Sequence, residues 1–272
     1  MTDPGQERAH VDVVNLRHAW GGRQIYDGLS CRFVEGKITV ILGASGGGKT
    51  TLLRMIACLG TPDWGDIWVG DQEITCMPEN QARRFRRKIG MMFQGGALLD
   101  SLTVYDNVAL PLREHTDLSE SQIREEVHRE FDAVGLANVD QLLPGQLSGG
   151  MMRRVALARA LIQKPEILLC DEPFSGLDPP AVRMIEALLV EVNEKLGVSM
   201  LVTSHHIGST LRMAHQIVFL CGGGAVQGPT HEIEHSTDPR IAGFFASAAN
   251  EDAYVEPVPG AGSTVPGEGG AS

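Results

Sequence analysis

Short apolar runs that alternate with helical patterns mark the regular elements of this chain. Four almost uninterrupted apolar runs have the length of a strand: Ile38–Leu42, Ile167–Cys170, Met200–Thr203 and Ile217–Leu220. Strands that are apolar throughout are buried on both faces, which is typical of a parallel sheet covered by helices. A helical pattern begins at Lys49, soon after the first run. The alternation predicts an α/β fold.

Two further segments repeat apolar residues at the spacing of a helix. One opens with Pro180 at the favoured first helical position and continues to Leu196, where Gly197 ends it. The other follows Ser119 and Gln122, whose spacing is that of a capping box. Its apolar stripe predicts an amphipathic helix.

Changes in composition along the chain suggest its domain organisation. The strand pattern disappears between about residues 95 and 163, which we interpret as a mostly helical insert. Residues 250–272 are rich in Glu, Pro, Gly and Ser and cannot bury enough surface to offset their ordering entropy, so we expect a flexible tail. We predict an N-terminal segment over residues 1–10 and one folded domain over residues 11–249.

Length and charge narrow the class of protein. The 272 residues are 43% hydrophobic, enough for one sizeable core. With 34 acidic and 23 basic side chains the net charge is -11, which repels phosphate backbones, so we expect no nucleic-acid partner. The five cysteines form no CxxC pair, which fits a reducing compartment. No apolar run approaches the length of a signal peptide or a membrane span, so we expect a cytosolic chain.

The segment GASGGGKT, residues 43–50, matches the P-loop pattern GxxxxGK[ST] between a strand and a helix. Glycines let backbone N–H groups converge on phosphate oxygens, and the following helix adds its positive N-terminal end. Lys49 is expected to neutralise the β- and γ-phosphates of ATP, and Thr50 to ligate Mg²⁺. The predicted nucleotide-binding residues of this segment are Gly43, Ser45, Gly46, Gly47, Gly48, Lys49, Thr50 and Thr51.

Two carboxylates follow the strand that begins at Ile167. Asp171 is expected to hold the Mg²⁺ shell and Glu172 to polarise the attacking water as a general base. An acidic pair after a strand can also lie in a solvated loop that has no role in catalysis. After a P-loop, an apolar strand that ends in two carboxylates favours phosphate chemistry.

The run LSGGMMRRVALARAL, residues 147–161, resembles the signature region of ABC ATPases. Ser148 and the amides of Gly149 and Gly150, at a helix start, form a second phosphate-binding nest. A simple helix N-cap is the alternative role of Ser148. The resemblance implies a P-loop NTPase fold of the ABC type, with a RecA-like mixed sheet core and an α-helical subdomain. It also implies a head-to-tail homodimer in which this nest serves the γ-phosphate held by the opposite subunit.

Further residues match ABC motifs in the order of that family, over about residues 11–228. Gln94 is similar to the glutamine that senses Mg²⁺ and the attacking water, and Asp178 lies in a segment that resembles the loop touching the partner subunit. His205 matches the switch histidine that contacts the γ-phosphate. Trp20 lies where the family usually places an aromatic ring on adenine, although a lone Trp is as often part of a core.

Two segments are similar to ATPases of Mla-type phospholipid transport systems: FQGGALLD, residues 93–100, and NVALPLREH, residues 107–115. The resemblance implies a bacterial ATPase at the cytoplasmic face of the inner membrane. It implies an integral membrane permease (MlaE-like) as the partner, together with an MCE lipid-binding protein and a STAS-domain protein on the helical insert. ATP and Mg²⁺ are the implied cofactors.

Other functions stay open on the residues alone. The chain could be an ABC ATPase for amino-acid import or lipoprotein release, or a soluble ABC ATPase of DNA repair or translation. An inactive structural subunit conflicts with the intact carboxylate pair. A dense basic run is either a solvated helix face or a contact to acidic lipid head groups or a permease loop; it comprises Arg83, Arg84, Arg86, Arg87 and Lys88.

Overall fold

The computed structural model describes residues 8–252 of the chain. One sheet contains β1 (Ala9–Trp20), β2 (Arg23–Val34), β4 (Trp64–Val69) and β5 (Gln72–Glu73). A second contains β3 (Ile38–Gly43), β6 (Ile89–Met92), β7 (Ile167–Asp171), β8 (Ser199–Thr203), β9 (Gln216–Cys221) and β10 (Gly224–Pro229). The α-helices are α1 (Lys49–Ile56), α2 (Glu79–Phe85), α3 (Val104–His115), α4 (Glu120–Ala133), α5 (Gly149–Leu161), α6 (Pro179–Leu196), α7 (Ile207–Met213), α8 (Thr230–Glu234) and α9 (Pro239–Asp252). Two 3₁₀ turns occupy Arg86–Lys88 and Pro144–Gln146.

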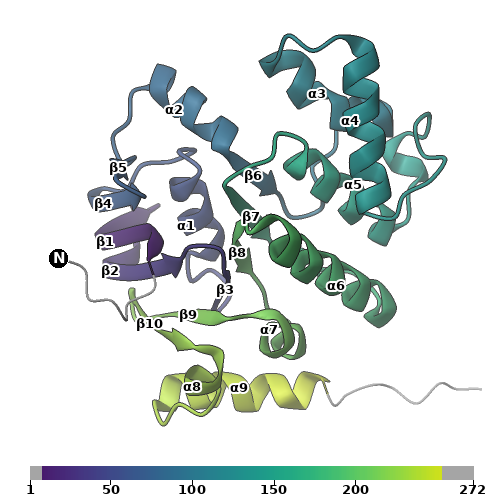
Figure 1. The fold of residues 1–272 in the computed structure, drawn as a ribbon. Helices are drawn as coiled ribbons and strands as arrows, with labels where there is room; N and C mark the ends of the chain where they lie inside the picture. The colour runs from purple at the N-terminus through teal and green to yellow at the C-terminus, as the bar shows by residue number, and fades with distance from the viewer. Residues whose placement is uncertain (1–7, 253–272) are drawn as a thin grey trace, which may run out of the picture.

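The second sheet confirms the strands predicted from apolar runs. Its order is β10-β9-β3-β8-β7-β6, and the strands from β9 to β6 pair in parallel, while β10 pairs antiparallel with β9. Every residue of β3, β7 and β8 is buried, because helices cover one face and the first sheet with α1 covers the other (Figure 1). The result is the expected mixed sheet, and its parallel strands end at one edge, beside the P-loop.

The first sheet was not predicted as a set of strands. It is antiparallel, in the order β2-β1-β4-β5, and α1 packs between it and the second sheet (Figure 1). Strands β1 and β2 form a hairpin whose turn consists of Gly21 and Gly22, with φ of +57° and +81°. Two consecutive residues with positive φ form the turn that matches the twist of a hairpin, and glycine adopts it without steric cost.

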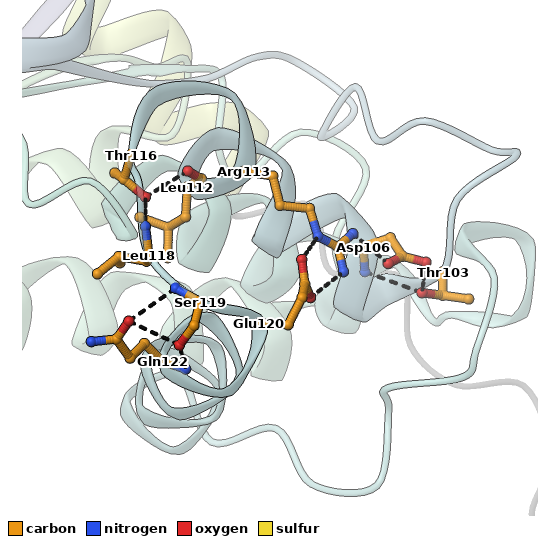
Figure 2. A network of polar contacts seen from close by, with 9 residues as sticks. All are labelled: Thr103, Asp106, Leu112, Arg113, Thr116, Leu118, Ser119, Glu120 and Gln122. Atoms are coloured by element: carbon orange, nitrogen blue, oxygen red, sulfur yellow. Dashed lines mark hydrogen bonds and ion pairs between the residues drawn. The ribbon is translucent and has the colours of Figure 1, made fainter.

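Between β6 and β7 the chain forms the helices α3, α4 and α5. Figure 1 shows α3 and α4 at the side of the sheets, and α5 packs against both of these helices and against β6. Ser119 caps α4 in the predicted capping box, since its hydroxyl accepts from the N–H of Gln122 while that side chain accepts from the N–H of Ser119. Figure 2 shows how Arg113 joins the two helices: its guanidinium donates to Asp106 at 2.8 Å and to both oxygens of Glu120 at 2.9 and 3.0 Å. The corner between α3 and α4 is therefore fixed by polar contacts.

Three predicted boundaries differ from the structure. Residue 10 lies inside β1, so the predicted segment 1–10 does not end there, and residues 1–7 lie outside the described part. Helix α6 begins at Pro179 instead of Pro180, because Asp178 provides the N-cap. Helix α9 extends to Asp252 through an alanine-rich stretch that favours helix, so the predicted tail is helical at its start; residues 253–272 are not described.

Across residues 8–252, no helix is both long enough and apolar enough to span a bilayer.

Candidate functional site

Glycines fix the path of the loop between β3 and α1. Gly48 has φ +95°, and a Cβ there would lie 2.6 Å from the ring of Tyr26, whose hydroxyl donates to the Gly48 carbonyl at 2.5 Å. Gly43 has φ +146°, and a Cβ there would lie 2.8 Å from the carbonyl oxygen of Leu220. A side chain at either position would be strained and would collide, so the loop can follow the sheet this closely only with glycine.

Lys49, the first residue of α1, is 7% exposed and bends back over the loop. Its Nζ donates to the carbonyl of Gly43 at 2.9 Å and to that of Ala44 at 3.3 Å. Burial lowers the pKa of Lys49, and the carboxylates of Glu172 and Asp171 oppose that shift. The ammonium group is thus placed between the loop backbone and the acidic pair.

Asp171, at the end of β7, is 3% exposed and receives two hydroxyl donors. Thr50 Oγ1 donates to its Oδ1 at 2.9 Å, and Thr203 Oγ1, from the end of β8, donates to the same atom at 2.7 Å. Hydroxyl and carboxylate oxygens are hard ligands of the kind that Mg²⁺ prefers, and one carboxylate with substrate phosphates is its usual protein environment. The donor set at Thr50 and Asp171 therefore fits Mg²⁺.

Glu172 is held at both its backbone and its side chain. Its N–H donates to Thr203 Oγ1 at 2.9 Å, and its Oε1 lies 2.9 Å from His205 Nε2. Its φ of +49° is unusual for a residue with a side chain, and such strain concentrates at functional sites. Burial raises the pKa of Glu172, although Lys49 opposes the rise. This arrangement suits a general base, because the carboxylate is desolvated and fixed in direction.

A cavity of about 810 Å³ opens at this edge of the sheet and contains most of the predicted nucleotide site. Trp20, at the end of β1, lines it with 72% of its surface exposed, so it is not a core residue. Gln94 lines it from the loop that follows β6. The predicted residues that line the cavity are Trp20, Ser45, Gly46, Gly48, Lys49, Thr50, Thr51, Gln94, Glu172 and His205. Gly43 and Gly47 belong to the same loop, and Asp171 is joined to the site by the hydrogen bond that it accepts from Thr50.

The signature residues and Asp178 do not line this cavity. Ser148 is the N-cap of α5 and accepts the backbone N–H of the third residue beyond it at 3.3 Å, and Gly149 and Gly150 follow in the first turn. Asp178 caps α6 in the same way, at 2.8 Å. Within one chain Ser148 and Asp178 therefore act as helix caps. The contact of the signature residues and Asp178 with the nucleotide site of a second copy stays a prediction.

Sequence reasoning gave no role at the site to Thr203 or to Arg23. Thr203 was recognised only as the end of a strand, yet its hydroxyl contacts both Asp171 and the backbone of Glu172. Arg23 lines the cavity from the start of β2. The dipeptide Gly21-Gly22 between two strand-like segments is a hairpin signal that could have found Arg23.

The raised pKa of Glu172 predicts that ATP hydrolysis is lost at acidic pH. An ordinary glutamate has a pKa of 4.5, and the Glu172 carboxyl takes up its proton at a higher pH because it is buried. As the pH falls through that pKa the base is neutralised, so kcat should fall at a pH above that of an exposed carboxylate. The pH profile of steady-state hydrolysis measures this, and Glu172→Gln should lack the same acid limb. Parallel acid limbs in both proteins would show that Glu172 is not the group whose protonation stops hydrolysis.

Comparison with known proteins identifies the family. A family model described as "ABC transporter" matches residues 26–175. The intermembrane phospholipid transport system ATP-binding protein MlaF of Haemophilus influenzae is 39% identical over 236 residues, which cover 86% of this chain and 89% of that protein. The methionine import ATP-binding protein MetN 1 of Pseudomonas fluorescens is 42% identical over 217 residues, which cover 78% of this chain but only 65% of that protein.

A solved structure agrees in fold. The ATP-binding cassette MJ0796, in a dimeric post-hydrolysis state bound to ADP and Pi, is 30% identical with a TM-score of 0.75, over 81% of this chain and 98% of that chain. The motifs, their order, the mixed sheet and these matches agree throughout. The chain belongs to the ABC transporter family.

Proposed function

We propose that this chain is the ATP-binding and ATP-hydrolysing subunit of an ABC transporter that moves phospholipid between bacterial membranes. The proposal of ATP hydrolysis rests on the buried pair Asp171 and Glu172, which lies near Lys49 where the parallel strands of the second sheet end. The similarity to MlaF, over nearly the whole of both chains, supports the cargo class.

Each group of residues in the cavity has its own role in binding or hydrolysing ATP. Backbone N–H groups of the loop and the ammonium of Lys49 bind the phosphates, and Trp20 offers its exposed ring to the base. Thr50, Asp171 and Gln94 would hold Mg²⁺, which when bound neutralises charge that develops on the transferred phosphoryl group. Glu172 accepts a proton from the attacking water, and His205 orients the Glu172 carboxylate by its 2.9 Å contact.

The active form is a homodimer. Ser148, Gly149 and Gly150 lie outside the cavity of their own chain although they form a phosphate-binding nest at a helix start. A second copy, docked head to tail, would bring its nest to the γ-phosphate, with Asp178 near the dimer contact. The dimeric state of MJ0796 with ADP and Pi supports this assembly. ATP then closes the dimer and hydrolysis reopens it.

The membrane partner is a separate MlaE-like permease, and this chain is peripheral at the cytoplasmic face of the inner membrane. An MCE lipid-binding protein and a STAS-domain protein complete the proposed assembly. The MlaF relative is named as the ATP-binding protein of an intermembrane phospholipid transport system, which supports a lipid-transporting partner. The permease type and the MCE and STAS components rest on the motif resemblance alone. The experiment is purification of the native complex in mild detergent, followed by mass spectrometry of proteins and lipids. Recovery of a permease with phospholipid supports the proposal; an assembly without lipid contradicts it.

Import of methionine is a second candidate, because MetN 1 is 42% identical to this chain. The matched region covers only 65% of MetN 1, whereas it covers 89% of MlaF. The alignment with MlaF is the more extensive of the two, over 236 residues against 217, and therefore favours the phospholipid system. Recovery of an amino-acid receptor in the same purification would favour the importer and contradict the phospholipid proposal.

A further inference from the structure

The tip of the β1–β2 hairpin presents two side chains as a cross-strand pair. Trp20 and Arg23 face each other across the turn of Gly21 and Gly22, and both line the nucleotide cavity. Residues paired across antiparallel strands point to the same side of the sheet. The short turn therefore delivers an aromatic ring and a guanidinium group to the same cavity.

The guanidinium of Arg23 lies over the middle of the P-loop. A Cβ built on Gly46 would be 3.6 Å from Nη1 of Arg23 and 3.9 Å from Nη2. Gly46 has φ +72° and no side chain to separate that guanidinium from the loop backbone. Both terminal nitrogens of Arg23 are thus within reach of an anion bound in the loop.

Arg23 also differs from other arginines of the same hairpin in having no acidic partner. Arg17 lies 3.6 Å from Asp27, and Arg32 lies 2.7 Å from Asp12. Among residues 8–252, no carboxylate forms an ion pair with Arg23. A cation without a counter-ion, held beside an anion-binding loop, has its electrostatic partner in the ligand.

We propose that Arg23 binds the β-phosphate of the nucleotide, an inference that rests on the proposed ATPase function. A guanidinium can give two parallel N–H donors to phosphate oxygens, which is stronger and more directional than a single contact. Arg23 then contacts the phosphates from the hairpin side of the cavity, while Lys49 contacts them from α1. Because ATP and ADP share the β-phosphate, Arg23 strengthens binding of both nucleotides and takes no part in the hydrolytic step.

The test measures binding of ATP, ADP and AMP to the purified full-length chain by calorimetry or competition. Arg23→Gln should weaken ATP and ADP about 10-fold each, as expected for loss of a charged hydrogen bond. AMP, which lacks the β-phosphate, should change less than about twofold on the same argument. Arg23→Lys keeps the charge but loses the two parallel donors, so its affinities for ATP and ADP should lie between those of the wild type and of Arg23→Gln. Arg17→Gln, on the same hairpin but paired with Asp27, is the matched control and should bind like the wild type.

Two results would overturn the proposal. Equal affinities of Arg23→Gln and the wild type for ATP and ADP would show that the guanidinium does not touch the phosphates. An equal loss for AMP and ADP would place Arg23 on the base or sugar, as an arginine stacked on adenine would be. Failure of the wild type itself to bind ATP would instead contradict the ATPase function, so the two failures are distinguishable.

Discussion

Glu172→Gln will bind ATP like the wild type but hydrolyse it about 10²- to 10⁴-fold more slowly, the usual contribution of a general base. Glutamine preserves the size of the side chain and removes its basicity. The Glu172 backbone is fixed independently by Thr203, so the loop should keep its shape. The loss should therefore fall on kcat, because ground-state binding is carried by the P-loop.

Steady-state hydrolysis and equilibrium ATP binding, measured on the same preparation, check this expectation. Glu166→Gln is a matched control, since Glu166 directly precedes β7 and pairs on the surface with Lys88 at 3.0 Å. It should keep full activity. Wild-type turnover by Glu172→Gln would remove Glu172 from the catalytic role.

Lys49→Ala should bind ATP weakly, so its defect should appear in the affinity for ATP and not only in the rate of hydrolysis. The ammonium is 7% exposed and lies on the loop carbonyls beside two carboxylates, where its charge is poorly screened by water. Loss of a hydrogen-bonded cation on phosphate weakens binding by about 10- to 100-fold.

The affinity for ATP, measured without turnover in the Glu172→Gln background, isolates this effect. Lys195→Ala is the control, because Lys195 is exposed near the end of α6 and pairs with Glu191 on the same helix. Retained affinity in the Lys49→Ala variant would contradict the assignment of the P-loop.

The buried parallel strands could be predicted from the sequence because tertiary packing agrees with local pattern there. β3 is buried along its whole length, so its apolar run follows directly from its buried environment. The glycines of the P-loop could be placed for a similar reason: the backbone conformation at Gly43 and Gly48 excludes a side chain. In both cases the environment admits few residue types: mainly apolar side chains in the strand and glycine in the loop.

The first hairpin could not be predicted in the same way. Register shifts interrupt β1 between Val13 and Leu16 and again near Ala19, so the alternation of buried and exposed residues that marks a strand is broken. The role of Thr203 depends on β8 lying beside β7, a contact between segments that are far apart in sequence.

In the proposed mechanism each active site is shared between two chains. Lys49 lines the nucleotide cavity of its own chain and Ser148 does not. In the proposed head-to-tail dimer, Ser148 of a second copy would lie at the nucleotide that Lys49 binds. Lys49→Ala disables the P-loop half-site, and Ser148→Arg blocks the signature half-site with a bulky charge. A heterodimer of these two variants contains one site with both defects and one site with none.

Co-expression of the two variants with different tags, sequential purification of the heterodimer and assay of its ATP hydrolysis test this claim directly. Each variant alone should be inactive as a homodimer. The heterodimer should recover activity, because the intact P-loop of one protomer meets the intact signature of its partner. A heterodimer as inactive as both parents, with wild-type thermal stability and confirmed pairing, would contradict the shared site.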